Sequence, residues 1–109
     1  MKDPVFEILT WKSAVNTNED AMIDAMDLFC QEVMMLPGFL HQALYKRDNG
    51  EWVCIYYWQT EKHAHDSNAA VIEWPSFQNL MVLINPETVT MDVFPCLQHV
   101  GEMSFCKKA

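Results

Sequence analysis

The sequence predicts one α+β domain in which a four-stranded antiparallel sheet carries helices on one face. Three observations lead to this fold class. Strand-like and helix-like segments follow one another in the order β-α-β-β-α-β. Asn49-Gly50, a strong signal for a tight hairpin, separates two apolar runs. The 109 residues suit a single domain, which we place at residues 1–97, with residues 98–109 as a C-terminal tail.

The first two elements are a strand over residues 5–14 and an amphipathic helix. Apolar residues of both parities indicate that the two faces of this strand are at least partly buried. Thr17 precedes the helix and, with Asp20 three residues later, resembles a capping box. Pro37-Gly38 ends the helix. Its apolar stripe has a spacing of three and four residues and consists of Met22, Met26, Phe29, Val33 and Leu36.

Residues 39–47 and 51–59 are predicted to form a hairpin. If Asn49 and Gly50 are the two loop residues, the strand register follows from the turn. One face would then carry the pairs Arg47–Trp52, Tyr45–Cys54, Ala43–Tyr56 and His41–Trp58.

The second half contains a broken helical segment and a last strand. Thr60 is positioned to cap a helix through Ile72, with Ala64, Ala69, Val71 and Ile72 as its thin apolar side. Trp74-Pro75 begins a third helix that buries Phe77, Leu80, Met81 and Ile84. A strand over residues 88–94 ends the domain. This order is that of the ferredoxin-like fold, whose helices cover one sheet face, so a second copy of the apolar sheet is the economical cover for the other.

Charge and composition exclude several classes of function. Seven Lys and Arg oppose 15 Asp and Glu, and the net charge is -8. Nucleic acid and anionic membrane surfaces both require a basic footprint, so neither is an expected partner. No apolar run approaches the roughly 20 residues of a membrane span. Four widely spaced cysteines without a CxxC pair favour reduced thiols and a cytoplasmic protein.

Several segments resemble the antibiotic-biosynthesis-monooxygenase-like (ABM) domains of the dimeric α+β barrel superfamily. These segments are VFEILTW at residues 5–11, LPGF at 36–39, GEWV at 50–53 leading to YW at 57–58, and NPETVTM at 85–91. The resemblance implies a homodimer joined through its sheet faces and a pocket between sheet and helices in each protomer. It also implies activities such as cofactor-independent oxygenation of aromatic molecules or oxidative haem degradation.

The haem-degrading branch fits the chain less well. That branch has a strand asparagine where this chain has Trp11, and a haem-ligating histidine where this chain has an apolar residue near Leu80. Leucine cannot ligate iron. We therefore expect no haem, and no cofactor of any other kind.

The predicted hairpin register places polar and aromatic side chains on one face of the sheet, and these form our candidate pocket. His41 and Tyr56 are the candidates for moving a proton, with His41 the first choice as base. Trp11, Trp52 and Trp58 are the candidate substrate-binding walls, on which an aromatic molecule could stack. The alternative is that all five are ordinary core residues whose N–H and O–H groups are paired within the protein.

Two further sequence patterns, a pair of histidines and the glycines, do not predict a binding site. His63 and His65 stand two residues apart, which on a helix directs their side chains to different faces, so no metal site is expected. The glycines Gly38, Gly50 and Gly101 are isolated and form no phosphate-binding loop. Two functions remain open beside a monooxygenase-like enzyme for a small hydrophobic or aromatic molecule: a non-catalytic ligand-binding or stress-related module, and a structural dimer without a ligand.

Overall fold

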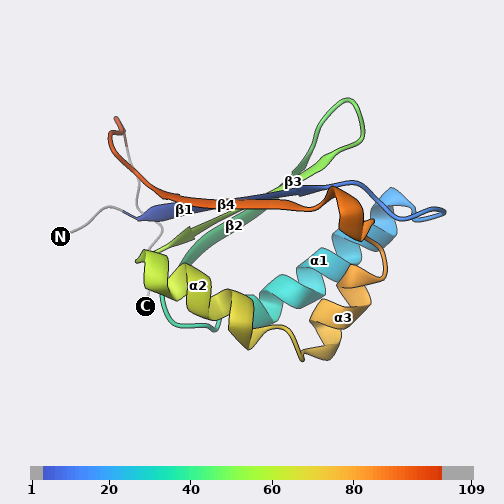
Figure 1. Ribbon diagram of the computed structural model, residues 1–109, viewed down its shortest axis with the longest axis horizontal. Coiled ribbons are helices and arrows are strands. Elements are labelled where there is room, and N and C mark those ends of the chain that lie inside the picture. The colour runs from blue at the N-terminus through green and yellow to red at the C-terminus, as the bar shows by residue number, and fades with distance from the viewer. Residues whose placement is uncertain (1–3, 102–109) are drawn as a thin grey trace.

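The computed structural model describes residues 4–101 and contains the predicted order of elements. The strands are β1 (Val5–Trp11), β2 (Phe39–Lys46), β3 (Trp52–Trp58) and β4 (Thr90–Pro95). The helices are α1 (Glu19–Val33), α2 (Glu61–Ala70) and α3 (Pro75–Met81), with a short 3-10 helix η1 (Pro86–Thr88) before β4. All three α-helices lie on the same side of the sheet (Figure 1). The predicted ferredoxin-like architecture is confirmed.

The sheet is antiparallel throughout and has the strand order β2-β3-β1-β4. The first strand is therefore central, pairing with β3 on one side and with β4 on the other. β1 ends at Trp11, earlier than predicted, and Ser13 makes only an isolated bridge to Ile84. The two inner strands position most of the side chains that the helices cover.

Helix α1 packs its apolar stripe on the sheet as the spacing predicted. Met22, Met26, Phe29 and Val33 are all buried. The predicted cap at Thr17 is wrong by one residue. Asn18 has the extended backbone of an N-cap, and its Oδ1 accepts a hydrogen bond from the Ala21 N–H at 2.7 Å.

The predicted hairpin register is also wrong by one residue, because the loop has three residues instead of two. The Arg47 N–H donates to the Glu51 carbonyl at 2.7 Å, and the Gly50 N–H donates to the Arg47 carbonyl at 2.9 Å. Among the loop residues only Gly50 has a positive φ, whereas the two-residue turn first expected needs a positive φ at both loop positions. Lys46, instead of Arg47, therefore stands opposite Trp52.

The shift in register separates residues that had been predicted to share a face. Gln42 pairs with Tyr56, and His41 pairs with Tyr57. The buried side chains of β3 are Trp52, Cys54, Tyr56 and Trp58, which face the helices. His41 and Tyr57 lie on the opposite face, where their ring centroids are 6.0 Å apart. The prediction that His41 lies beside Trp58 on one face is therefore wrong.

The second half of the chain follows the prediction with shifted boundaries. Thr60 caps α2 as expected, since its Oγ1 accepts from the His63 N–H, but the helix ends at Ala70. Ala64 and Val71 are buried, whereas Ala69 and Ile72 are exposed. Pro75 begins α3 as predicted.

The last strand starts at Thr90, because η1 occupies the residues before it. Residues 98–101 of the predicted tail belong to no helix or strand, and residues 102–109 lie outside the described part of the chain. Within residues 4–101, no helix combines the length and the apolar character that crossing a bilayer requires.

Candidate functional site

A cavity of about 250 Å³ lies between the sheet and the helices. The lining from the strands includes Leu9, Trp11, Cys54, Tyr56 and Met91, and the lining from the helices and the turn after α2 includes Met26, Phe29, Val71, Phe77 and Leu80. Val89 and Met91, which also line it, are exposed residues, so the cavity reaches the surface beside β4. A pocket between sheet and helices, as the resemblance to ABM domains implied, is present. Its apolar lining suits a small hydrophobic molecule.

A second cavity of about 70 Å³ adjoins the first. Six residues line both cavities: Leu9, Phe29, Tyr56, Asn68, Val71 and Phe77. The smaller cavity adds two residues of the sheet, Glu7 and Trp58. The two cavities are therefore neighbours, and Glu7 lines only the smaller one.

Glu7 is a buried carboxyl group that our sequence analysis did not select. Its side chain faces the helices from the centre of the sheet and is 1 % exposed. Glu7 Oε1 accepts a hydrogen bond from Trp58 Nε1 at 2.8 Å, and Glu7 Oε2 accepts one from Asn68 Nδ2 at 3.4 Å. Burial raises the pKa of Glu7, although the two hydrogen bonds act in the opposite direction. Its position two residues from both Val5 and Leu9, on the apolar parity of the strand, was the signal that could have revealed it.

Tyr56 lies in the wall shared by both cavities. Its hydroxyl oxygen is 3.5 Å from Cys30 Sγ, and its ring stacks on that of Trp58 with centroids 5.9 Å apart. Burial raises the pKa of the Tyr56 phenol well above its usual value, so the phenolate needed for a base does not form near neutral pH. Tyr56 can still form a hydrogen bond to a bound molecule through its neutral hydroxyl.

Two cysteines surround this tyrosine. Burial raises the pKa of the Cys30 thiol to about 12 and that of the Cys54 thiol to about 11. Both are free thiols, and Gln42 Nε2 contacts Cys54 Sγ at 3.4 Å. A thiolate nucleophile is therefore disfavoured at this wall.

Trp11 and Trp58, both predicted as substrate-binding walls, border these cavities. Trp11 lines the larger one and is 2 % exposed, and within residues 4–101 its buried indole N–H has no hydrogen-bond partner. Trp58 lines the smaller one and holds Glu7 through its own N–H. Phe39 packs edge-on against Trp58, with ring centroids 5.8 Å apart.

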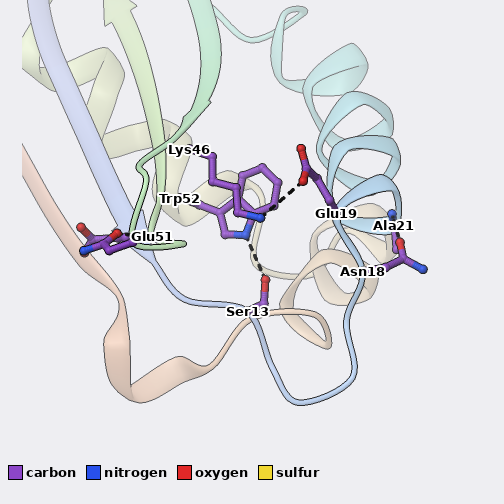
Figure 2. A network of polar contacts seen from close by, with 8 residues as sticks. Ser13, Asn18, Glu19, Ala21, Lys46, Glu51 and Trp52 are labelled. Atoms are coloured by element: carbon purple, nitrogen blue, oxygen red, sulfur yellow. Dashed lines mark hydrogen bonds and ion pairs between the residues drawn. The ribbon is translucent and has the colours of Figure 1, made fainter.

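Trp52, the third predicted wall, lies at the far end of β3 and is not among the residues that line either cavity. Its indole N–H donates to Ser13 Oγ at 2.9 Å, and Lys46 Nζ lies 4.9 Å from the centre of its ring (Figure 2). Lys46 also pairs with Glu19 at the start of α1, at 3.5 Å. These contacts join the hairpin to α1 and to the loop before it, which is a structural role.

His41, the predicted base, lines neither of the two cavities between sheet and helices. It borders a separate groove of about 280 Å³ between α1 and β2, together with Asp27, Gln31 and Met34. The structure thus brings Trp11, Tyr56 and Trp58 together and leaves His41 and Trp52 apart from them.

The charge pattern of the site is simple. Glu7 is the one charged residue among the described residues that line the two cavities. In the described part of the chain, no three His, Cys, Asp or Glu side chains gather as a metal-binding group would.

Known structures share this architecture. SnoaB from Streptomyces nogalater, described as a cofactor-independent oxygenase, superposes with a TM-score of 0.75 at 17 % identity, covering 92 % of this chain and 99 % of its own. An antibiotic-biosynthesis-monooxygenase-like protein from Nitrosomonas europaea has a TM-score of 0.73 at 12 % identity, covering 93 % and 97 %. The chain has the ABM-like fold.

A further ABM-like protein, from Chloroflexus aurantiacus, has a TM-score of 0.64 at 14 % identity and covers 91 % of this chain and 98 % of its own. No family model matches the sequence. No curated protein matches it either. At these identities the similarity establishes the ABM-like fold, and function must be argued from the site.

Proposed function

We propose that the protein is a cofactor-independent monooxygenase-type enzyme that acts on a small hydrophobic or aromatic molecule held between sheet and helices. The observation that carries this proposal is an apolar cavity, with a buried carboxyl group in the wall of the smaller cavity beside it, in a domain of the ABM-like fold. SnoaB, described as a cofactor-independent oxygenase, has the same fold and supports the proposal by analogy.

The proposed reaction requires little machinery from the protein. The substrate loses a proton and becomes electron-rich enough to reduce dioxygen itself. A CH₂ group would become a C=O group, one oxygen atom entering the product and the other leaving as water. The site contributes by orienting the substrate, accepting its proton and excluding bulk water.

Three of the predicted residues keep a proposed role in this site. Trp11 and Trp58 supply flat apolar walls, and Tyr56 supplies a neutral hydroxyl between them. His41 and Trp52 face other surroundings, so we assign them no part in the cavity.

A cavity-filling variant tests the proposal. Val71→Phe adds volume inside the cavity, whereas Ile72→Phe changes the neighbouring residue, which is 54 % exposed. In wild type and Ile72→Phe we expect planar aromatics to quench tryptophan fluorescence, and at least one of them to drive oxygen consumption. Val71→Phe should lose both responses.

Two outcomes contradict the enzyme. Quenching without oxygen consumption by any binding molecule favours the non-catalytic ligand-binding module. No quenching by any planar aromatic leaves the structural dimer.

We also propose that a second copy of the chain covers the open face of the sheet. A row of rings crosses this face through Phe94, Phe6, Tyr57 and His41, with adjacent centroids 5.4, 5.3 and 6.0 Å apart. The helices lie only on the other side (Figure 1). An aromatic face of this kind, left open by the helices, suits an isologous dimer.

Light scattering measures the oligomeric state directly. Ile55 lies at the middle of the open face, opposite Ile8 and Ala43, whereas Leu28 is 66 % exposed on α1. Ile55→Lys should yield monomers, and Leu28→Lys should leave the dimer intact. A monomeric wild-type protein would refute this assembly.

We propose a reducing compartment, the cytoplasm, for the protein. Cys30, Cys54 and Cys96 are free thiols, which supports this assignment. Fractionation of the native cells, followed by detection of the chain, tests it.

A further inference from the structure

We propose that Glu7 is the proton acceptor of this cavity, and that its buried charge restricts the cavity to molecules that enter neutral and carry a weakly acidic O–H or C–H group. The inference rests on the monooxygenase-type function proposed above. It adds a catalytic residue and a charge rule for the substrate.

The geometry holds the Glu7 carboxylate in place and leaves it able to accept a proton. Trp58 and Asn68 each donate one hydrogen bond, to different oxygens of the carboxylate. Each carboxylate oxygen has two lone-pair directions, so each keeps one for a substrate proton. Asn68 lines both cavities and Glu7 lines the smaller one, so a substrate in the larger cavity would reach Glu7 by extending its X–H group past Asn68 into the smaller cavity.

The electrostatics of the cavity favour transfer of a proton to Glu7. Loss of hydration on burial raises the pKa of Glu7 and makes its carboxylate a stronger base. The other titratable groups that act at this position are the Cys54 thiol of β3, which is uncharged, and His65 on the exposed side of α2, which lowers the pKa of Glu7 when charged. Neither of these groups is a cation inside the cavity.

The proton-transfer step conserves charge. The X–H bond of the substrate breaks, its proton moves to Glu7 Oε2, and the electron pair stays on the substrate. The cavity contains one negative charge before the step and one after it. The substrate anion then faces a neutral carboxylic acid and is ready to reduce dioxygen.

The charge of Glu7 also excludes anionic substrates. Glu7 is the only charged side chain among the described residues that line the cavities, so a substrate carboxylate would place two negative charges together without a cation. Repulsion between like charges in a low-dielectric space is severe. A neutral phenol, enol or activated CH₂ group meets no such repulsion.

The alternative is that Glu7 only holds the Trp58 indole in place. Binding of 4-nitrophenol, whose absorption moves to longer wavelength when its O–H donates to a base, separates the two roles. Below the pKa of free 4-nitrophenol, we expect wild type to bind the neutral molecule and its absorption to move to longer wavelength, because the O–H donates a charge-assisted hydrogen bond to the Glu7 carboxylate. Glu7→Gln should bind it with a much smaller shift, and Glu73→Gln, which changes an exposed glutamate, should behave as wild type.

The affinity for 4-nitrophenol, measured across pH, is a second test of Glu7 as the proton acceptor. Wild type should prefer neutral 4-nitrophenol over its anion by at least about tenfold, because the anion meets the Glu7 carboxylate. The preference should nearly disappear in Glu7→Gln. Equal preference in the two proteins, or failure of wild type to bind 4-nitrophenol, overturns the proposal.

If Glu7→Gln fails to fold, the proposal can still be tested with infrared difference spectra of wild type with and without 4-nitrophenol. Binding of 4-nitrophenol should shift the carboxylate bands of Glu7, because the carboxylate accepts the hydrogen bond of the phenol, and unchanged carboxylate bands overturn the proposal. Oxygen consumption separates this inference from the function on which it rests. If Glu7→Gln consumes oxygen at the wild-type rate, the enzyme stands and Glu7 is not its base. If no aromatic drives oxygen consumption but the absorption shift of 4-nitrophenol depends on Glu7, the monooxygenase reaction is wrong and Glu7 remains the group that accepts from the acidic O–H of a bound molecule.

Discussion

Gly38 packs its backbone directly against the side chain of His63 at the start of α2. A Cβ at Gly38 would lie 2.6 Å from His63 Cβ and closer still to its ring, and the φ of Gly38 is +82°. The Gln59 N–H also donates to the Gly38 carbonyl at 2.9 Å. The turn after α1 is thereby fixed against the beginning of α2.

Gly38→Ala should therefore cost far more stability than the matched change Gly50→Ala. Gly50 has a similar φ of +92°, but no atom lies within 4 Å of its added Cβ, so its substitution carries only the backbone cost of about 1–2 kcal/mol. We expect Gly38→Ala to exceed this by about 1–3 kcal/mol, as overpacking does. Urea unfolding measures both, and His63→Ala should recover part of the excess. Equal losses of stability in Gly38→Ala and Gly50→Ala would show that the His63 side chain moves aside at little energetic cost.

Replacing two buried tryptophans should separate an indole that forms a hydrogen bond from one that does not. Trp11→Phe loses ring area but no hydrogen bond within the described residues, whereas Trp58→Phe also removes the donor to Glu7. A lost hydrogen bond to a buried charged group costs about 1–3 kcal/mol. The free energy of unfolding should fall by about that much more in Trp58→Phe. Equal losses would mean that the Trp58–Glu7 bond adds nothing to stability.

The raised pKa of Glu7 predicts how stability depends on pH. Below the ordinary value of 4.5, Glu7 is protonated in both the folded and the unfolded chain. As the pH rises, the unfolded chain releases this proton first, so the free energy of unfolding falls until the pH passes the higher pKa of the folded state. Glu7→Gln lacks this loss, and its stability relative to wild type should improve with rising pH.

Denaturant unfolding of wild type and Glu7→Gln, followed from acidic to mildly alkaline pH, checks this sign. Glu73→Gln serves as the control for the removal of one negative charge. A raised pKa at Glu7 would be contradicted if the difference in unfolding free energy between Glu7→Gln and wild type is constant with pH. It would also be contradicted if that difference moves in favour of wild type as the pH rises.

Thiol labelling should distinguish the cysteines of the folded protein. The raised pKa values of Cys30 and Cys54, about 12 and about 11, keep both thiols protonated at mildly alkaline pH. Cys96 is partly exposed. We expect iodoacetamide to label Cys96 at least about a hundredfold faster than Cys30 and Cys54, since the thiolate is the reactive form. Mass spectrometry of peptides gives each rate separately, and rapid labelling of Cys54 would count against this picture of the cavity wall.

The order of elements was predictable because each segment has a local signal. The stripe from Met22 to Val33 and the proline of Pro75 do not depend on distant residues. The hairpin register was not predictable, since an Asn-Gly pair occurs in two-residue loops and in three-residue loops alike. The backbone angle of Asn49 decides between them, and sequence does not specify it.

This uncertainty decided where the predicted base, His41, lies. A shift of one residue reverses the face of every side chain in a strand. It removed His41 from the neighbourhood of Trp58, although both residue types had been chosen for sound chemical reasons. Tyr56 and Trp58 were predicted to share a face because they belong to the same strand, and parity within one strand needs no register. Glu7 was overlooked because its partners, Trp58 and Asn68, lie 51 and 61 residues away.

The central position of β1 also fixes the order in which the domain can assemble. Thr10 and Thr90 are partners across the β1–β4 ladder although 80 residues separate them. During synthesis, β1 therefore has one unpaired edge until almost the whole domain has left the ribosome, and long-range pairing of this kind is slow. Met91, at the beginning of β4, also borders the cavity. The binding space is thus completed by the last strand to be made, which couples the appearance of a ligand site to the final step of folding.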